Sequence, residues 1–213
     1  EDLICSLGMR VVEKDVTDWH DDAGAISRKD LVAVNAILFL NKTNIGGATP
    51  PLVTHKIPVA RRFWETANAI AGFGEEGAKE KTVAAQPVVL KALAKLVYDF
   101  AFSPRRDENT ADQNLEKLLS GITDVDFSHS NPMWRYYEFD NQERLAAGLA
   151  QLGAYLPPSD DKANRDIGSV QNGFMRFGAK HNDIYPLLGD MIRWSIGLPP
   201  RSHKGPLPSE SQS

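Results

Sequence analysis

Residues 87–102 read PVVLKALAKLVYDFAF, and this stretch decides the fold class. Its apolar side chains recur at spacings of three and four residues, which is the period of a helix with one buried face. The residues of that face are Leu90, Leu93, Ala94, Val97 and Ala101. Lys91 and Lys95 are four residues apart and lie together on the outside of the same helix. The stretch predicts a helix packed on a core, with a basic pair at the surface.

Two segments on the N-terminal side carry further helix signals. Ser27 stands three residues before Asp30, a variant of the capping box, and opens a dense apolar run over 31–41. A second helix is predicted over 58–72, because proline is favoured at the first helical position and apolar residues follow at helical spacing. Between them, residues 44–51 (NIGGATPP) cannot continue a helix.

The rest of the chain predicts more helix and little strand. Thr110 can cap a short helix that buries three leucines, and further helices are predicted over 142–155, 167–177 and 185–196. Residues 122–127 alternate like a short strand or an extended linker, and residues 3–12 read as a buried strand or a short helix. The fold class predicted is mainly α: an irregular multi-helix bundle with one or two short strands.

The division into domains follows from these boundaries. Residues 27–200 form one helical domain, and residues 201–213 hold serine, proline and charge without an apolar pattern, which predicts a disordered tail. Residues 1–26 are interpreted as the remnant of, or a linker to, a missing N-terminal domain, because the chain starts without Met and residues 3–12 already read as a buried strand or short helix. We expect the parent protein to be longer.

Composition excludes several classes of protein. Hydrophobic residues make up 42% of the chain and charged residues 24%, which is typical of a globular domain. No apolar run approaches the roughly 20 residues that span a bilayer, so no membrane partner is expected. The single Cys5 and the acidic start, which is not that of a secretory signal, favour a cytoplasmic location.

Charge is distributed unevenly along the chain. The formal net charge is -4, yet residues 28–106 hold twelve basic and six acidic side chains. Basic residues interleaved with aromatic ones are typical of a nucleic-acid contact surface, although ordinary solvated helix faces would give the same pattern. Trp134, in the stretch 130–135 (SNPMWR), has two interpretations as well. It is either a core residue or an aromatic residue beside an arginine that contacts a phosphate or a base. The candidate DNA-binding residues are Arg61, Arg62, Lys91, Lys95, Arg105, Arg106 and Arg135.

Motifs for catalysis are missing from the sequence. It contains no phosphate-binding glycine loop, no GxSxG nucleophile elbow and no zinc-ligand spacing of Cys and His. The clusters at 20–22 (HDD) and 181–183 (HND) are interpreted as solvated polar groups. We predict no catalytic residue, no metal and no cofactor, and whether the whole protein is an enzyme stays open.

Several landmarks resemble the C-terminal half of the DNA sulfur modification protein DndB and related DGQHR-domain proteins. They are SRKDLVAVNAIL at 27–38, the Phe63-Trp64-Glu65 helix, TVAAQPVVLKALAKL at 82–96, LLSGITDVDFSHSNPMW at 118–134 and WSIGLPP at 194–200. The Asp-Gly-Gln-His-Arg signature of that family does not occur here, so the resemblance is to the helical region downstream of it. It implies a role in phosphorothioate DNA modification or related phage defence, with DNA binding in transcriptional control.

Three functions remain as hypotheses. The first is a regulatory helical region of a DNA sulfur modification system that contacts DNA or other subunits of the system. The second is a protein–protein assembly module whose basic helices face another protein. The third is the non-catalytic C-terminal part of an enzyme whose active site lies in a missing N-terminal domain.

Overall fold

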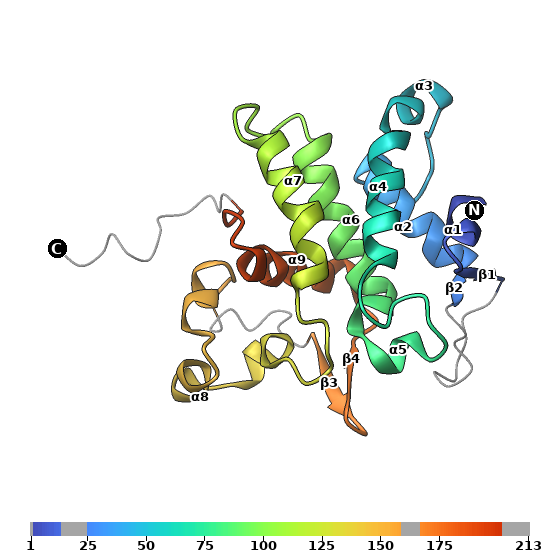
Figure 1. Ribbon diagram of the computed structural model, residues 1–213. Coiled ribbons are helices and arrows are strands. Elements are labelled where there is room, and N and C mark those ends of the chain that lie inside the picture. Colours follow the sequence, from blue (N-terminus) through green and yellow to red (C-terminus); the bar gives the residue numbers. More distant parts are fainter. Residues whose placement is uncertain (1, 14–24, 159–166, 202–213) are drawn as a thin grey trace.

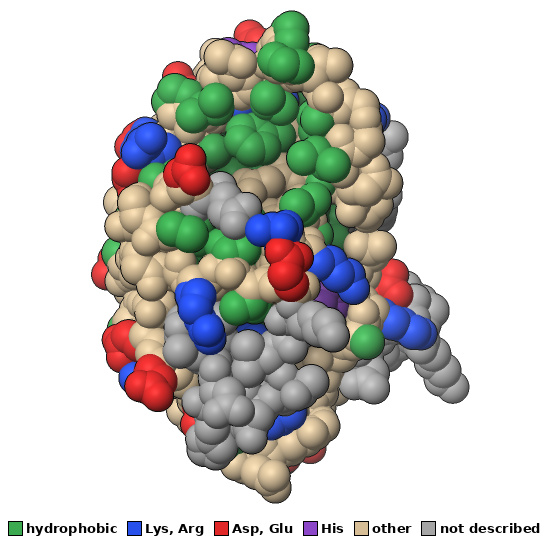
Figure 2. All heavy atoms as spheres, turned by 90° about the vertical axis from the view of Figure 1, so that its right-hand side faces the viewer, with side chains coloured by type: hydrophobic (Ala, Val, Ile, Leu, Met, Phe, Trp, Pro, Cys, Tyr) green, Lys and Arg blue, Asp and Glu red, His purple; other side chains and the backbone are tan. Residues whose placement is uncertain are grey.

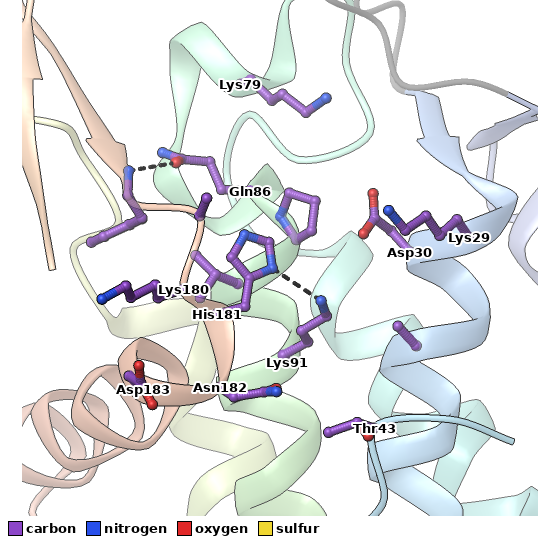
Figure 3. A pocket seen from close by; sticks show the side chains of 15 residues that line it. Lys29, Asp30, Thr43, Lys79, Gln86, Lys91, Lys180, His181, Asn182 and Asp183 are labelled. Atoms are coloured by element: carbon purple, nitrogen blue, oxygen red, sulfur yellow. Dashed lines mark hydrogen bonds between the residues drawn. The ribbon is translucent and has the colours of Figure 1, made fainter. Parts of the chain in front are cut away.

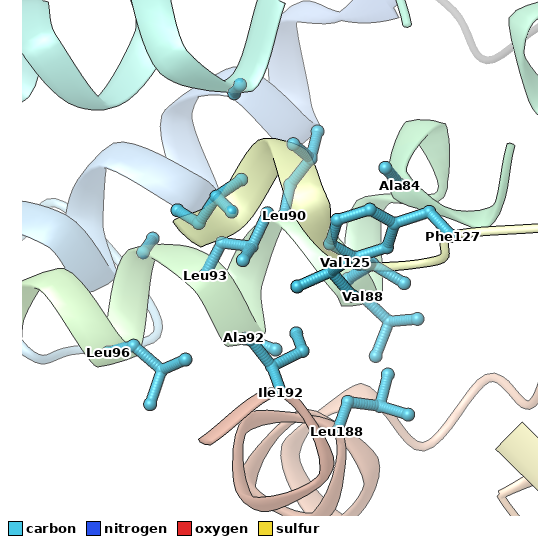
Figure 4. Packing of buried hydrophobic residues seen from close by; sticks show 14 of the residues in the cluster. Ala84, Val88, Leu90, Ala92, Leu93, Leu96, Val125, Phe127, Leu188 and Ile192 are labelled. Carbon is cyan, nitrogen blue, oxygen red and sulfur yellow. The ribbon is translucent and has the colours of Figure 1, made fainter. Parts of the chain in front are cut away.

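Helix α6 (Pro87–Ala101) is the central element of the fold (Figure 1). Nine of its fifteen residues are buried, so it is apolar over most of its circumference, as expected of a helix surrounded by other elements. It packs most extensively against α2 (Arg28–Leu40) and α9 (His181–Ile196), and then against α7 (Ala111–Gly121). Figure 4 shows Val88 and Ala92 of α6 next to Leu188 and Ile192 of α9. The computed structural model describes residues 2–13, 25–158 and 167–201.

Shorter helices complete the bundle. Helix α4 (Ile57–Asn68) packs on α7 and α6, and its buried residues are Ala60, Phe63, Trp64 and Ala67. The remaining helical elements are α1 (Asp2–Ser6), α3 (Pro50–Val53), η1 (Thr54–Lys56), α5 (Ala78–Lys81), η2 (Val83–Ala85), η3 (Ile122–Asp124), η4 (Pro132–Glu138), α8 (Asn141–Ala146) and η5 (Ala150–Ala154). The prediction of a mainly α, irregular multi-helix bundle is confirmed.

The helix boundaries follow the sequence signals closely. At the start of α2 the Asp30 backbone N–H donates to Ser27 Oγ at 3.1 Å, which confirms the predicted cap. The same helix ends at Asn41, whose φ of 54° places it in the left-handed region that stops a helix. The predicted helix over 87–102 is confirmed as α6, and the one over 185–196 begins earlier, at His181.

Residues 122–124 form η3 instead of the start of the predicted strand or extended linker, and two predicted helices were also wrong. Residues 167–177 form a hairpin of β3 (Gly168–Gln171) and β4 (Phe174–Phe177), not a helix. The reason is the pair Asn172-Gly173, whose φ values of 53° and 85° are those of a tight hairpin turn. The predicted helix over 142–155 is broken after α8 by Gly148, at a φ of 73°, and the chain continues as η5.

The N-terminal residues form both of the alternatives that the sequence left open. Helix α1 is followed by β1 (Arg10–Val12), which pairs in parallel with β2 (Ala25–Ser27) in the register Arg10 to Ala25. The cluster at 20–22 and most of the predicted tail, 202–213, lie outside the described residues.

One face of the molecule carries exposed apolar groups. Figure 2 looks onto the side on which α1, α2, α3 and α4 lie and shows hydrophobic side chains gathered toward one end of it. The exposed large apolar residues of this part of the chain are Val32, Ile45, Leu52 and Ile57.

Candidate nucleic-acid interface

The candidate site lies along the outer side of α6. Lys91 and Lys95 are one helical turn apart, about 6 Å along the axis, and both are partly buried between neighbouring elements. Each lines a hollow in the surface. We name them the amino-end hollow and the carboxyl-end hollow, after the ends of α6 that they adjoin.

The amino-end hollow has a volume of about 860 Å³ and lies between α2, α6 and the start of α9 (Figure 3). Four lysines and two aspartates line it, together with neutral side chains. The lining residues are Lys29, Asp30, Ala33, Thr43, Lys79, Gln86, Pro87, Val88, Lys91, Phe177, Ala179, Lys180, His181, Asn182 and Asp183. The cations exceed the carboxylates by two.

Local geometry adds to this positive charge. Lys29, Pro87 and His181 are each the first or second residue of a long helix, so the positive ends of three helix dipoles reach the amino-end hollow. Lys91 Nζ lies 3.0 Å from His181 Nδ1. Because an ammonium group only donates, Nδ1 accepts and the imidazole proton is on Nε2. Asp30 is engaged by Ser27 Oγ, which donates to Oδ2 at 2.8 Å.

The carboxyl-end hollow has a volume of about 740 Å³ and lies between the end of α6, the loop before α7 and the end of α9. Its lining holds five cations and two carboxylates. The charged lining residues are Lys95, Asp99, Arg105, Arg106, Asp107, Arg193 and Arg201. Both hollows therefore have an excess of positive charge, although the whole chain carries -4.

Ion pairs fix the walls of the carboxyl-end hollow. Asp99 pairs with Lys95 one turn away, and its other oxygen lies 3.6 Å from Arg193 Nη2. Arg201 makes a bidentate contact with the fully buried Asp190, with Nε donating to Oδ1 at 2.7 Å. Burial acts to lower the pKa of Arg201, but the contact with Asp190 outweighs it and the pKa is raised. Arg201, in the segment after α9, is thus held against this helix through Asp190.

The structure separates the predicted DNA-binding residues into three places. Lys91, Lys95, Arg105 and Arg106 line the two hollows. Arg61 and Arg62 lie on α4, and neither belongs to the described lining of either hollow. Arg62 forms a forked pair with Glu116 of α7, with both distances 2.8 Å, so a carboxylate already engages this arginine.

Arg135 lies in the third place. Its Nε donates to Glu138 Oε2 at 2.7 Å, and its guanidinium lies 5.2 Å from the centre of the Phe139 ring. Trp134 beside it is fully buried, stacks on Phe127 and donates from Nε1 to the Ser128 carbonyl at 3.1 Å. Of the two interpretations of this stretch, the structure supports the core residue for Trp134.

Five cations of the hollows were not recognised as site residues from the sequence: Lys29, Lys79, Lys180, Arg193 and Arg201. They come from α2, α5, the two ends of α9 and the segment after it, so only packing brings them to α6. The apolar pattern of α9 gives no sign that Arg193 is buried.

Other kinds of site find no support within residues 2–13, 25–158 and 167–201. In these ranges no three His, Cys, Asp or Glu side chains are grouped so that they could hold a metal ion. Nor does any helix of the described part combine the length and the apolar composition needed to cross a bilayer.

Comparison with known proteins identifies the family. Searches among curated proteins and among solved structures find no match to the chain. The model of the family DndB, described as DNA-sulfur modification-associated, matches residues 14–190, which include α2, α6 and most of α9. This match confirms the resemblance to the family, and the landmark at 194–200 lies outside the matched residues. The chain therefore belongs to the DndB family of DNA-sulfur modification-associated proteins.

Proposed function

We propose that this chain is a regulatory, DNA-contacting component of a cytoplasmic DNA sulfur modification system, and that it holds the DNA backbone along α6. The observation that carries the proposal is the position of Lys91 and Lys95. They form one ridge that joins two hollows, each of which has more cations than carboxylates. Family membership supplies the association with DNA sulfur modification.

The chemistry of the ridge suits phosphates more than bases. Lysine is a flexible point charge, and phosphate contacts position a protein on DNA without reading its sequence. Exposed Lys29, Lys180 and Arg105 extend the charge on either side of the ridge. The proposed binding is therefore weak and largely independent of sequence.

A salt titration of DNA binding tests the proposal. Each phosphate contact on duplex DNA adds about 0.9 to the magnitude of the log–log salt slope. If both ridge lysines contact phosphate, the double variant Lys91→Ala/Lys95→Ala should lower the slope by about 1.8 and weaken binding equally for unrelated sequences. Fluorescence anisotropy with labelled duplexes at several salt concentrations measures both quantities.

The matched control is Arg61→Ala/Arg62→Ala, which removes the same number of charges from α4 and should leave the slope unchanged. If the salt slope decreased in the α4 variant but not in the ridge variant, the DNA interface would lie on α4 instead. No binding by the parent chain at low salt would refute DNA contact and favour the assembly-module hypothesis. Circular dichroism of each variant checks that it is folded.

A further inference from the structure

The carboxyl-end hollow contains a buried arginine that the phosphates of a DNA duplex would not reach. Arg193 lines this hollow but is only 5% exposed. The phosphates of a duplex lie on a convex surface and can touch residues at the rim, such as Arg105 and Arg106. A small anion, in contrast, can enter a hollow of about 740 Å³, a size typical of small-molecule sites.

Arg193 is a buried cation with incomplete compensation. Its Nη1 donates to the Pro199 carbonyl at 3.2 Å, and its guanidinium lies 4.7 Å from the centre of the Phe100 ring. The nearest Asp99 oxygen is 3.6 Å away, and Asp99 also pairs with Lys95. The buried Nε has no hydrogen-bond partner within the described residues. Burial lowers the pKa of Arg193, and the carboxylates of Asp99 and Asp190 offset only part of this effect.

The charges around the carboxyl-end hollow indicate how much negative charge a ligand would need to neutralise them. Five cations line it, against Asp99 and Asp107 in the lining and Asp190 buried behind Arg201. Three carboxylates against five cations leave +2. A phosphate monoester carries about 1.5 to 2 negative charges at pH 7, which matches this excess.

The hydrogen-bond donors of the hollow also suit a phosphate group. Guanidinium groups present forked N–H donors that fit phosphate oxygens, and four of the five cations are arginines. The start of α7, an eleven-residue helix, also borders the hollow through Ala111 and adds the positive end of its dipole.

We propose that the carboxyl-end hollow binds the phosphate monoester group of a small molecule, independently of DNA. Arg105 and Arg106 contact the group from the loop before α7, and Arg193 with Lys95 supplies the positive floor. The anion neutralises the excess charge that the three carboxylates leave.

Isothermal titration calorimetry without DNA tests this proposal, with AMP, inorganic phosphate, adenosine and dimethyl phosphate as probes. AMP should bind, whereas adenosine and the singly charged dimethyl phosphate should bind at least about tenfold more weakly, since a lost charged hydrogen bond costs about 1.5–3 kcal/mol. Binding of inorganic phosphate as well would assign the site to the phosphate group alone, and binding of AMP only would assign it to a nucleotide. Equal affinity for adenosine and AMP would overturn the proposal.

Variants place the site. Arg105→Ala/Arg106→Ala, in an exposed loop, should lower AMP affinity about tenfold or more, and Arg193→Lys, which keeps the buried charge but not the fork, should lower it as well. The control variant Arg10→Ala/Lys81→Ala removes two cations that lie outside the hollow, and it should leave the AMP affinity unchanged. Full affinity in the loop variant, or no binding of AMP and phosphate by the parent chain, would refute the site. DNA binding that persists in that case would leave the proposed function intact.

Discussion

Buried polar side chains join distant parts of the chain at the level of single residues. Gln86, the residue before α6, donates from Nε2 to the Met175 carbonyl at 2.8 Å and accepts at Oε1 from the Phe177 N–H at 3.2 Å. His129 makes a similar bridge, because Nδ1 accepts from the Met175 N–H at 3.0 Å while Nε2 lies 2.9 Å from the Lys79 carbonyl. Both side chains attach the β3–β4 hairpin to the helical core.

His129 should make stability depend on pH. Burial of the imidazole lowers the pKa of His129 below the usual 6.5, and this effect outweighs its backbone hydrogen bonds, which act to raise the pKa. Between the lowered pKa and about 6.5 the unfolded chain binds more protons than the native one, so the free energy of unfolding should fall as pH decreases through this window. Above about pH 6.5 the contribution of His129 to stability is fully present. Urea unfolding from pH 7.5 to 5.0 measures the slope. His129→Gln should be less stable at pH 7.5 but show a weaker pH dependence, and an unchanged dependence would contradict this assignment.

Close approaches set the spacing of elements. Gly189 of α9 faces Leu96 of α6, and a Cβ there would lie 3.7 Å from Leu96 Cδ2, which is an ordinary contact. Gly168, at the start of β3, has a φ of 145°, and a Cβ there would lie 2.1 Å from the Arg176 carbonyl oxygen on the paired strand. The helix pair therefore tolerates a methyl group, whereas the strand pair does not.

These two glycines give a matched pair of substitutions. Gly189→Ala should stabilise the protein by up to about 1 kcal/mol, because glycine disfavours a helix interior and the space for a methyl group exists. Gly168→Ala should destabilise it by about 1–3 kcal/mol through backbone strain, in addition to the steric overlap. Thermal unfolding of both variants beside the parent chain measures the shifts. A gain at Gly168 or a loss at Gly189 would show that the hairpin or the α6–α9 contact is packed differently.

The whole molecule is built around one helix, α6, which belongs to the core and also carries part of the candidate site. The buried side of α6 packs on α2, α7 and α9, while its outer side carries Lys91 and Lys95 between the two hollows. Helices at the periphery contribute less to the core, since α3 and α8 bury none of their residues. Stability should accordingly be unequal across the structure.

Native-state hydrogen exchange should reveal this order. We expect the amides of α6 to exchange slowest, through global unfolding, because its hydrogen bonds are shielded on nearly every side. Amides of α3 and α8 should exchange orders of magnitude faster through local opening. Mass spectrometry of peptides that cover these helices measures the rates. Exchange of α6 as fast as that of α8 would contradict a core centred on α6.

The sequence by itself determined the helical class and the limits of α6 and α2, because capping and apolar periodicity are local signals. It also determined the membership in the DndB family. It failed at residues 167–177, where the turn preference of Asn172-Gly173 and the bonds from Gln86 and His129 overrode a weak helical spacing. Only the tertiary structure decided which cations share a site. Lys91 and Lys95 were visible on one predicted helix. Lys29, Lys180 and Arg193, which line the hollows with them, come from segments far away along the chain, and charge carries no periodic signal that predicts such convergence.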